Sequence, residues 1–307
     1  MTYEAIIIGG GPAGLTAAIY CARKNLRTLL LTKDIGGQAV LSQDIENYLG
    51  FTMITGQDLV QHFRDHLAAF KDIVTVQEGV AVTSLDRTDD TTFRITVDNG
   101  TTYDSHVVII ASGRKPRWLG VPGEEEFKGR GVAVCATCDG AFFKGKDVAV
   151  IGGGNSAMDA AITMAKFCKT VHIVVANPAL QGDEIFKHKI AANPNIVVHG
   201  NAKTLAVEGD QRVTGLSVMI DGIAQVLTVA GVFVEIGWLP SADFDHVAPH
   251  DKQGAVLVDR DGQTGIPGLY AAGDVNDLWG EQIIIAAGEG AKVAMLASQY
   301  INKLQQK

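Results

Sequence analysis

Short runs of Val, Ile and Leu, many of them next to glycine, recur along the chain at residues 5–8, 28–31, 107–110, 148–151, 171–175, 232–236 and 269–271. Such nearly continuous apolar runs are typical of parallel strands buried on both faces. Helical periodicity fills several gaps between them, at residues 12–23, 56–70 and 155–167. This alternation predicts an α/β fold with right-handed crossovers. The polar stretch 86–90 predicts a solvated hairpin or turn rather than a binding site.

One strand-glycine-helix pattern occurs twice. Residues 6–14 are Ile-Ile-Ile-Gly-Gly-Gly-Pro-Ala-Gly, and residues 148–157 are Val-Ala-Val-Ile-Gly-Gly-Gly-Asn-Ser-Ala. The repeat predicts two mononucleotide-binding-type domains. Polar segments that contain proline, 114–117 and 239–243, are the predicted hinges. We therefore expect a discontinuous first domain, residues 1–114 and 242–307, and a second domain over residues 115–241.

Length and charge narrow the class of protein. The chain has 307 residues, of which 47% are hydrophobic, which is enough for two separate cores. A net charge of -8 argues against a nucleic-acid-binding surface, because such surfaces carry clustered Lys and Arg. The N-terminal residues lack a signal-peptide pattern, and no apolar run approaches the roughly 18 residues of a membrane span. We expect a cytoplasmic protein that binds neither nucleic acid nor membrane.

The first glycine motif predicts a dinucleotide site. Gly9 permits a tight turn, Gly11 lets the backbone approach a pyrophosphate, and Gly14 lets helix and strand pack closely. An acid that binds the ribose often follows about 20 residues later, but here Thr32 and Lys33 occupy the end of the second strand. The alternative is a glycine-rich turn without a ligand.

A second candidate ligand-binding residue follows the apolar residues 269–272. Asp274, next to Gly273, can accept a hydrogen bond from a ribityl hydroxyl. The alternative is that Asp274 is a helix N-cap.

The second glycine motif, Gly152, Gly154 and Ala157, predicts another pyrophosphate site. An acid after the next strand would indicate NAD and an arginine would indicate NADP, yet the chain continues Val175-Ala176-Asn177. Asn177 can bind a ribose hydroxyl without a charge. The alternative is a motif that keeps the fold and no longer binds a pyridine nucleotide.

Cys135 and Cys138 are the strongest local signal. A two-residue spacer brings two thiols within disulfide distance, and a following helix would favour the thiolate of the first. Half of a zinc site is the alternative, but no second pair of ligands accompanies it. Cys21 and Cys168 stand alone in helical patterns, so we predict that they are small buried residues.

Together these motifs closely resemble the low-molecular-weight thioredoxin reductases, along essentially the whole chain. Gly36-Gly37-Gln38, Asp44-Ile45-Glu46-Asn47-Tyr48, Phe142-Phe143-Lys144-Gly145-Lys146 and Glu281 to Lys292 are most similar to the reductase portion of the alkyl hydroperoxide reductase F subunit. The resemblance implies two Rossmann-like FAD/NAD(P)-binding domains of the pyridine nucleotide-disulfide oxidoreductase type. The extra N-terminal redox domain of that reductase has no counterpart here, so a separate carrier protein is expected.

The resemblance and the motifs together give the candidate site residues. For FAD they are Gly9, Gly11, Pro12, Ala13, Gly14, Thr32, Lys33, Gly37, Gln38, Asn47, Ala81, Ala111, Ser112, Gly113, Gly273, Asp274, Gln282 and Ile283. For the second nucleotide they are Gly152, Gly154, Asn155, Ser156, Ala157 and Asn177. The resemblance also implies that Cys138 faces the flavin, that Cys135 attacks the partner disulfide and that Asp139 transfers a proton. A helix over residues 282–297 would point its N-terminus at the flavin pyrimidine.

The sequence departs from this family at two places. Ser112 stands where threonine is common, which is a mild change. Neither the His-Arg-Arg stretch of NADPH enzymes nor the acid of the hydroperoxide reductases follows Val174. The donor therefore stays open between NADH, NADPH and a non-pyridine donor such as ferredoxin, deazaflavin or a second flavin, with NADH preferred to NADPH.

The predicted function is an FAD-dependent disulfide reductase that serves a thioredoxin-like, glutaredoxin-like or peroxiredoxin partner. Family resemblance implies a homodimer, and it implies that the two domains swing about the hinges so that the thiols meet first flavin and then partner. A flavin-bearing redox sensor is the alternative from another functional class. Electron flow from dithiol to flavin is a further alternative, because reduction potentials decide the direction.

Overall fold

The computed structural model describes residues 2–42 and 45–306. The chain divides into two compact units, Met1–Lys115 with Leu239–Lys307, and Pro116–Trp238. It passes from one unit to the other through two short strands, β7 (Arg114–Pro116) and β16 (Trp238–Pro240), which pair with each other.

The first unit is built on a seven-stranded sheet. Six strands follow the order β3-β2-β1-β6-β5-β4, and β17 pairs with β6. The pairs among β3, β2, β1, β6 and β17 are parallel, whereas β4, β5 and β6 pair antiparallel. The strands are β1 Thr2–Gly10, β2 Thr28–Ile35, β3 Val74–Glu78, β4 Val82–Arg87, β5 Phe93–Val97, β6 Thr102–Ile110 and β17 Leu269–Ala271.

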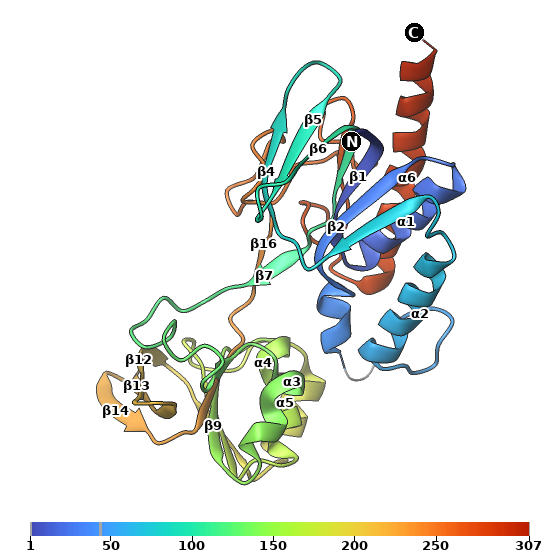
Figure 1. The fold of residues 1–307 in the computed structure, drawn as a ribbon. Helices are drawn as coiled ribbons and strands as arrows, with labels where there is room; N and C mark the ends of the chain where they lie inside the picture. The colour runs from blue at the N-terminus through green and yellow to red at the C-terminus, as the bar shows by residue number, and fades with distance from the viewer. Residues whose placement is uncertain (1, 43–44, 307) are drawn as a thin grey trace. The chain divides into compact units, whose positions relative to one another are not determined.

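Helices cover one face of this sheet, and α1 packs directly against α6 (Figure 1). The helices are α1 Pro12–Arg23, the 3-10 helix η1 Gly37–Leu41, α2 Gly56–Ala68 and α6 Ile283–Gln305. The first sheet has a hydrophobic core on each face, because successive side chains along β1 point to opposite faces. Ala5 and Ile7 pack toward the helices, whereas Ile6 and Ile8 pack toward β4, β5 and the loops after β16. All four residues are almost fully buried, as strands covered on both faces require.

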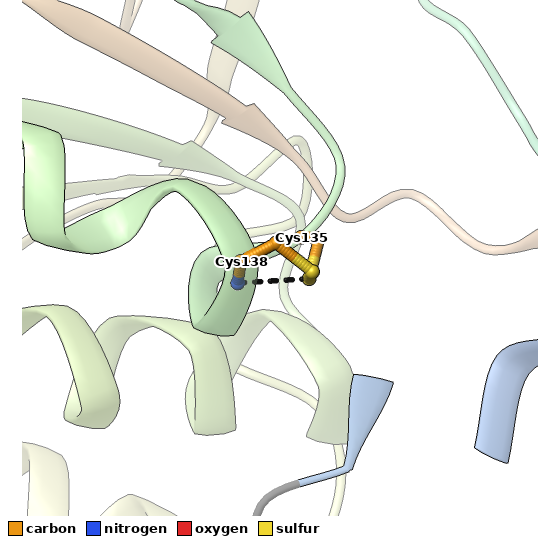
Figure 2. Close-up of a disulfide and its surroundings, with 2 residues drawn as sticks. All are labelled: Cys135 and Cys138. Carbon is orange, nitrogen blue, oxygen red and sulfur yellow. Dashed lines mark hydrogen bonds between the residues drawn. A yellow bond between two sulfur atoms is a disulfide. The ribbon is translucent and has the colours of Figure 1, made fainter. Parts of the chain in front are cut away.

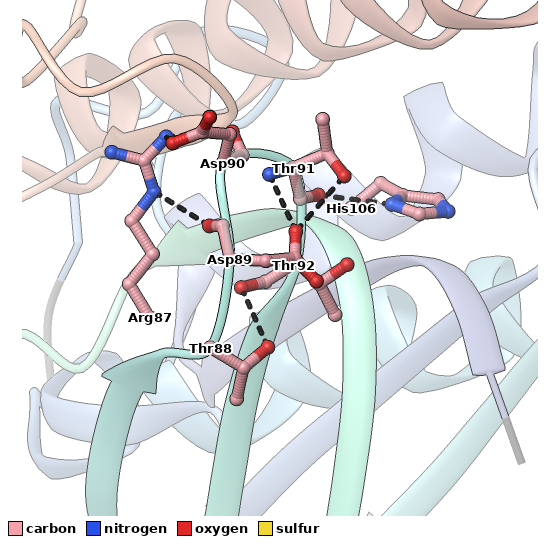
Figure 3. A network of polar contacts seen from close by, with 7 residues as sticks. All are labelled: Arg87, Thr88, Asp89, Asp90, Thr91, Thr92 and His106. Atoms are coloured by element: carbon pink, nitrogen blue, oxygen red, sulfur yellow. Dashed lines mark hydrogen bonds and ion pairs between the residues drawn. The ribbon is translucent and has the colours of Figure 1, made fainter.

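The turn between β4 and β5 is held by its own polar groups (Figure 3). Arg87 donates to the carbonyls of Asp89 and Asp90 at 3.0 and 2.6 Å, and the Asp89 carboxylate accepts from the backbone N–H of Thr91 at 2.8 Å. The ring of His106 contacts the Thr91 carbonyl at 2.9 Å. The prediction of a solvated turn over residues 86–90 is confirmed.

The second unit has a five-stranded parallel sheet in the order β11-β10-β9-β15-β8. Its strands are β8 Val132–Ala133, β9 Asp147–Ile151, β10 Thr170–Val174, β11 Ile196–His199 and β15 Gly231–Val234. One face packs on α3 Ala136–Asp139, the 3-10 helix η2 Gly140–Phe143, α4 Asn155–Ala165 and α5 Glu184–Ala191. The other face packs on an antiparallel sheet, β12 Ala202–Gly209, β13 Val213–Ile220 and β14 Ile223–Leu227.

The predicted α/β class, with two Rossmann-like sheets, is confirmed. Several ends differ from the predicted ones: β10 ends at Val174, β15 at Val234, α2 at Ala68 and α4 at Ala165. Cys168 therefore lies beyond the helix that was expected to contain it, although it is buried as predicted. Within the described ranges, no helix combines the length and apolar character needed to cross a membrane.

Candidate functional site

The first glycine turn leaves room over only one of its three motif glycines. A Cβ on Gly9, which has a φ of 114°, would lie 2.2 Å from the Ala111 carbonyl oxygen. A Cβ on Gly14 would lie 1.9 Å from the Gly9 carbonyl oxygen, whereas a Cβ on Gly11 would meet no atom within 4 Å. Gly9 and Gly14 thus serve close packing, and the backbone at Gly11 is open to a ligand.

Helix α1 begins at this turn without a side-chain cap from any described residue. Pro12 is its first residue and Gly11 its N-cap, so the next N–H groups, those of Ala13 and Gly14, point out of the helix end. Backbone N–H groups at a helix N-terminus favour a phosphate. Gly37 lies against Gly11, because its Cβ would come within 3.3 Å of the Gly11 Cα. The predicted pyrophosphate residues therefore form one open backbone cradle.

Thr32 is committed to the protein's own backbone. Its hydroxyl accepts from the Gly10 N–H at 2.9 Å and donates to the Asp34 carbonyl at 2.5 Å. Thr32 is buried, Lys33 is exposed, and the Val80 N–H donates to the Thr32 carbonyl at 3.1 Å, which brings neighbouring Ala81 to this strand. Thr32 positions the glycine turn with its side chain.

Residues far apart in the sequence meet at the carboxyl end of the first sheet. Asn47 Nδ2 donates to Gln282 Oε1 at 2.8 Å, and Gln282 is the N-cap residue of α6, just before Ile283. Ser112, between Ala111 and Gly113, donates to the Ser241 carbonyl at 2.6 Å. Of the motif around Asn47, Asp44 lies outside the described residues.

Asp274 sits in a partly buried, largely acidic environment. Glu289 holds the turn, because its carboxylate accepts from the Gly273 N–H at 2.7 Å and from Asn276 Nδ2 at 2.8 Å. Burial raises the pKa of Asp274, as do the charges of Glu281 and Glu289, while Arg114 opposes them. The alternative that Asp274 caps a helix is wrong, because α6 begins only at Ile283.

Arg114 is a residue of this region that the sequence did not single out. Gln38 Nε2 donates to its carbonyl at 3.3 Å, and its guanidinium reaches both the Asp274 carbonyl and the Glu281 carboxylate. Its only sequence signal was a place in a segment predicted as a hinge.

In the second unit, Cys135 and Cys138 are joined by a disulfide, with their Cα atoms 5.3 Å apart (Figure 2). Cys135 is the N-cap residue of α3, and its Sγ accepts from the Cys138 N–H at 3.1 Å. Cys135 and Asp139 are half-buried, whereas Cys138 is exposed. The helix expected after Cys135 is short, because α3 gives way to η2 at Gly140. The two cysteines thus form a disulfide at the start of a short helix.

A pocket of about 190 Å³ opens beside Asp139. Phe142 and Phe143 form an apolar side, and Phe142 is 74% exposed. Three basic residues also line the pocket: Arg130, Lys146 and Arg212. The pocket thus presents apolar and cationic surface next to the disulfide turn.

The second glycine turn resembles the first in its backbone. A Cβ on Gly152 would lie 2.1 Å from the Glu235 carbonyl oxygen, whereas one on Gly154 would meet nothing within 4 Å. Helix α4 begins there without a side-chain cap among the described residues, with Ser156 exposed and Ala157 buried.

The loop after β10 folds back onto this turn. Asn155 Oδ1 accepts from the Asp183 N–H at 2.9 Å, and Asn155 Nδ2 donates to the Asp183 carboxylate at 3.1 Å. The Gln181 N–H donates to the Gly153 carbonyl at 2.7 Å. Asn177 is exposed, and its carbonyl accepts from the Asn201 N–H. The Asn155 side chain is therefore already engaged, whereas Asn177 is at the surface.

The comparisons with known proteins decide the family. The family described as pyridine nucleotide-disulphide oxidoreductase matches residues 3–290. The chain belongs to this family. Its members use FAD and a pyridine nucleotide, and the chain has the fold of the thioredoxin reductases, as predicted. The first unit fits FAD, because it combines an open backbone cradle, a helix start with no side-chain cap among the described residues, and a partly buried carboxyl group at Asp274.

Individual members of the pyridine nucleotide-disulphide oxidoreductase family support this assignment. In Staphylococcus epidermidis, the F component of alkyl hydroperoxide reductase is 40% identical over 302 residues, which cover 97% of this chain and 59% of that protein. An NADH dehydrogenase of Bacillus subtilis is 38% identical over 97% of this chain and 58% of its own length. The chain thus spans less than three fifths of these two relatives. The thioredoxin reductase of Lactococcus lactis has a TM-score of 0.90 at 33% identity, covering 98% of this chain and 99% of that structure.

Proposed function

We propose that this chain is an FAD-dependent reductase that passes electrons through Cys135 and Cys138 to the disulfide of a thioredoxin-like or glutaredoxin-like protein. The observation that carries the proposal is the disulfide at the start of α3, with Cys138 exposed. It stands in the unit that also holds the second glycine turn. A homodimer in the cytoplasm is part of the proposal.

The first domain, residues 1–114 and 242–307, would hold FAD. The pyrophosphate would lie over Gly11 at the start of α1, where added atoms meet open space. Asp274 would accept from a ribityl hydroxyl, and the start of α6 at Gln282 and Ile283 would favour negative charge on the pyrimidine edge. When bound, FAD supplies the electron pair that opens the disulfide of the second domain, residues 115–241.

The thiols then carry the reaction. Two electrons and two protons convert the disulfide into two thiols. The Cys135 thiolate attacks the partner's disulfide, forming one S–S bond to the partner while the partner's second sulfur leaves as a thiolate. Cys138 next attacks Cys135 Sγ, which re-forms the original disulfide and releases the reduced partner. Asp139, at the end of α3, is the group that passes a proton to a leaving thiolate.

The pocket beside Asp139 supports a protein substrate. An exposed phenylalanine ring is costly in water and suits an apolar contact with a partner. The surrounding Arg130, Lys146 and Arg212 suit acidic groups at the rim of such a contact. A partner with an apolar surface and acidic neighbours near its own disulfide fits this description.

NADH is the donor that we propose. The turn at Gly154 is open and α4 starts without a side-chain cap, as a pyrophosphate site requires. The segment after β10 offers the uncharged Asn177 in place of arginine, so nothing there selects the 2′-phosphate of NADPH. The Bacillus subtilis relative, named NADH dehydrogenase, also supports NADH.

A non-pyridine donor is the second candidate, and one observation favours it. The Asp183 carboxylate is hydrogen-bonded to Asn155 at the start of α4, where it would oppose an incoming pyrophosphate. A ferredoxin, a deazaflavin or a second flavin would bypass this turn altogether.

Anaerobic titration of the purified protein with NADH, and in parallel with NADPH, tests the donor. We expect NADH to bleach the flavin absorbance at micromolar concentration and NADPH only at much higher concentration. Indifference to both nicotinamides would overturn NADH and support the second candidate.

An assay of thioredoxin reduction tests the substrate class. We expect multiple turnovers with the wild-type protein and none with Cys135→Ser. Protein that binds and reduces flavin yet never turns over would instead be a redox sensor.

A further inference from the structure

Arg114 links the parts of the first unit that surround Asp274. Its Nε donates to the Asp274 carbonyl at 2.9 Å, and its Nη1 pairs with Glu281 Oε1 at 2.7 Å. Its own carbonyl accepts from Gln38 Nε2 at 3.3 Å. One residue therefore connects η1, the turn after β17 and the segment that leads into α6.

The partial burial of the Arg114 side chain strengthens these contacts. Its side chain is only 23% exposed, in contrast to the 50% of Arg94, which pairs with Asp104 on the surface of β5 and β6. A planar guanidinium can bond two acceptors at once in a fixed geometry, which a lysine ammonium cannot reproduce. The two acceptors of Arg114 are the backbone carbonyl of Asp274 and the carboxylate of Glu281, whose charge acts on Asp274.

The charges around Asp274 oppose one another. Glu281 and Glu289 raise the pKa of Asp274 in addition to burial, and Arg114 is the cation that lowers it. These are the charged groups that act on Asp274 from β7, from the segment before α6 and from α6 itself. Without Arg114, the carboxyl groups of Asp274, Glu281 and Glu289 would lose the cation that offsets their mutual repulsion.

We propose that Arg114 is a positioning residue of the FAD site: its guanidinium ties the Asp274 turn to the segment that leads into α6, and so holds Asp274 in place for the ribityl chain. This inference rests on the proposed function, because it assumes that FAD occupies the first unit. The inference adds to the FAD site a residue that acts on the cofactor only by holding Asp274 and the segment before α6.

The test measures FAD affinity of the full chain across pH, with FAD itself as the probe. The variants are Arg114→Gln, Arg114→Lys and Glu281→Gln, and the matched control is Arg94→Gln, which removes an exposed arginine pair from the same unit. We expect Arg114→Gln to raise the Kd for FAD about tenfold near neutral pH, as loss of a hydrogen bond from a charged group does. Arg114→Lys should recover part of that loss, and the control should match wild type.

The pH dependence separates positioning from a merely structural role. Because protonation of Asp274 weakens its acceptor role, FAD affinity should fall on the acid side of the profile. Removing the Arg114 cation raises the pKa of Asp274 further, so this acid limb moves to higher pH. Removing the Glu281 charge lowers the pKa, so the limb moves to lower pH. Two variants that only loosened the fold would instead move the acid limb in the same direction.

Opposite shifts in Arg114→Gln and Glu281→Gln support the proposal. Shifts in the same direction, or an Arg114→Gln affinity within about twofold of the control, would overturn it. If Arg114→Gln does not fold, the half-exposed Glu281→Gln variant decides alone by the direction of its shift. Wild-type protein that binds no FAD would overturn the proposed function as well, so the two failures are distinguishable.

Discussion

At the scale of single residues, the four cysteines divide into two kinds. Burial raises the pKa of Cys21 to about 12, with the Thr28 hydroxyl acting in the opposite direction. Burial and the charge of Asp147 raise the pKa of Cys168 to about 11. Cys135 and Cys138 instead stand at the start of α3, where Cys135 is half-buried and Cys138 is exposed.

Alkylation of mildly reduced native protein should therefore modify only two thiols rapidly. We expect iodoacetamide to label Cys135 and Cys138, and to label Cys21 and Cys168 only after unfolding, because the thiolate is the reacting form. Mass spectrometry of the peptides measures this, with denatured protein as the control. Rapid labelling of Cys21 in the folded state would contradict the assignment.

Glu235 predicts a dependence of stability on pH. Burial, and secondarily the charge of Asp159, raises the pKa of Glu235 from 4.5 to about 7. The folded state thus holds this proton more tightly than the unfolded state, and stability falls as pH rises from about 4.5 to about 7. The loss is at most on the order of 3 kcal/mol.

Glu235→Gln should remove that loss. Urea unfolding should find the variant more stable than wild type at about pH 8 and close to it at about pH 4. The same stability difference at both pH values would show that Glu235 is not the titrating group.

Sequence patterns identified residues whose chemistry is local. The glycines and the cysteine pair act through their own backbone geometry or spacing, so a short motif carries the information. Arg114 acts through Asp274 and Glu281, which only folding brings near it. Glu235 likewise responds to Asp159, which is distant from it in the sequence. No short motif could indicate them.

At the scale of elements, α1 and α6 approach each other closely at Gly290. A Cβ on Gly290 would lie 2.0 Å from the Ala13 carbonyl oxygen, at the helix start that we assign to FAD. Gly288, two positions earlier in the same helix, has open space instead.

Two alanine substitutions should therefore have opposite effects. Gly290→Ala should destabilise the protein by about 1–3 kcal/mol through overpacking, and should weaken FAD retention. Gly288→Ala should be neutral or stabilising by up to about 1 kcal/mol, because alanine favours a helix. Thermal unfolding and flavin content measure both, and equal effects would refute close packing of α1 and α6.

Element boundaries were predictable where strong signals mark them. Helix α1 spans Pro12–Arg23 as predicted, because a glycine turn precedes it, proline is its first residue, and the polar Lys24 and Asn25 follow it. The antiparallel sheet of β12, β13 and β14 was not predicted. Its strands are only partly buried and lack continuous apolar runs, so the pattern used to find buried strands passes over them.

At the scale of the whole molecule, the disulfide oxidoreductase class followed from two glycine turns and a cysteine pair in one chain. The sequence did not identify the electron donor. The choice of donor depends on the loop after β10. Directly after the strand, this loop has neither the acid that would indicate NADH nor the arginine that would indicate NADPH. Further along, its Asp183 is hydrogen-bonded to Asn155.

The most direct test of the central claim is an anaerobic dithionite titration of the flavin-loaded protein. If the Cys135–Cys138 disulfide exchanges electrons with FAD, wild type should take up two electrons more per flavin than Cys138→Ser, because a disulfide is a two-electron couple. Equal uptake by the two proteins would show that the disulfide does not exchange electrons with the flavin, and would contradict the account.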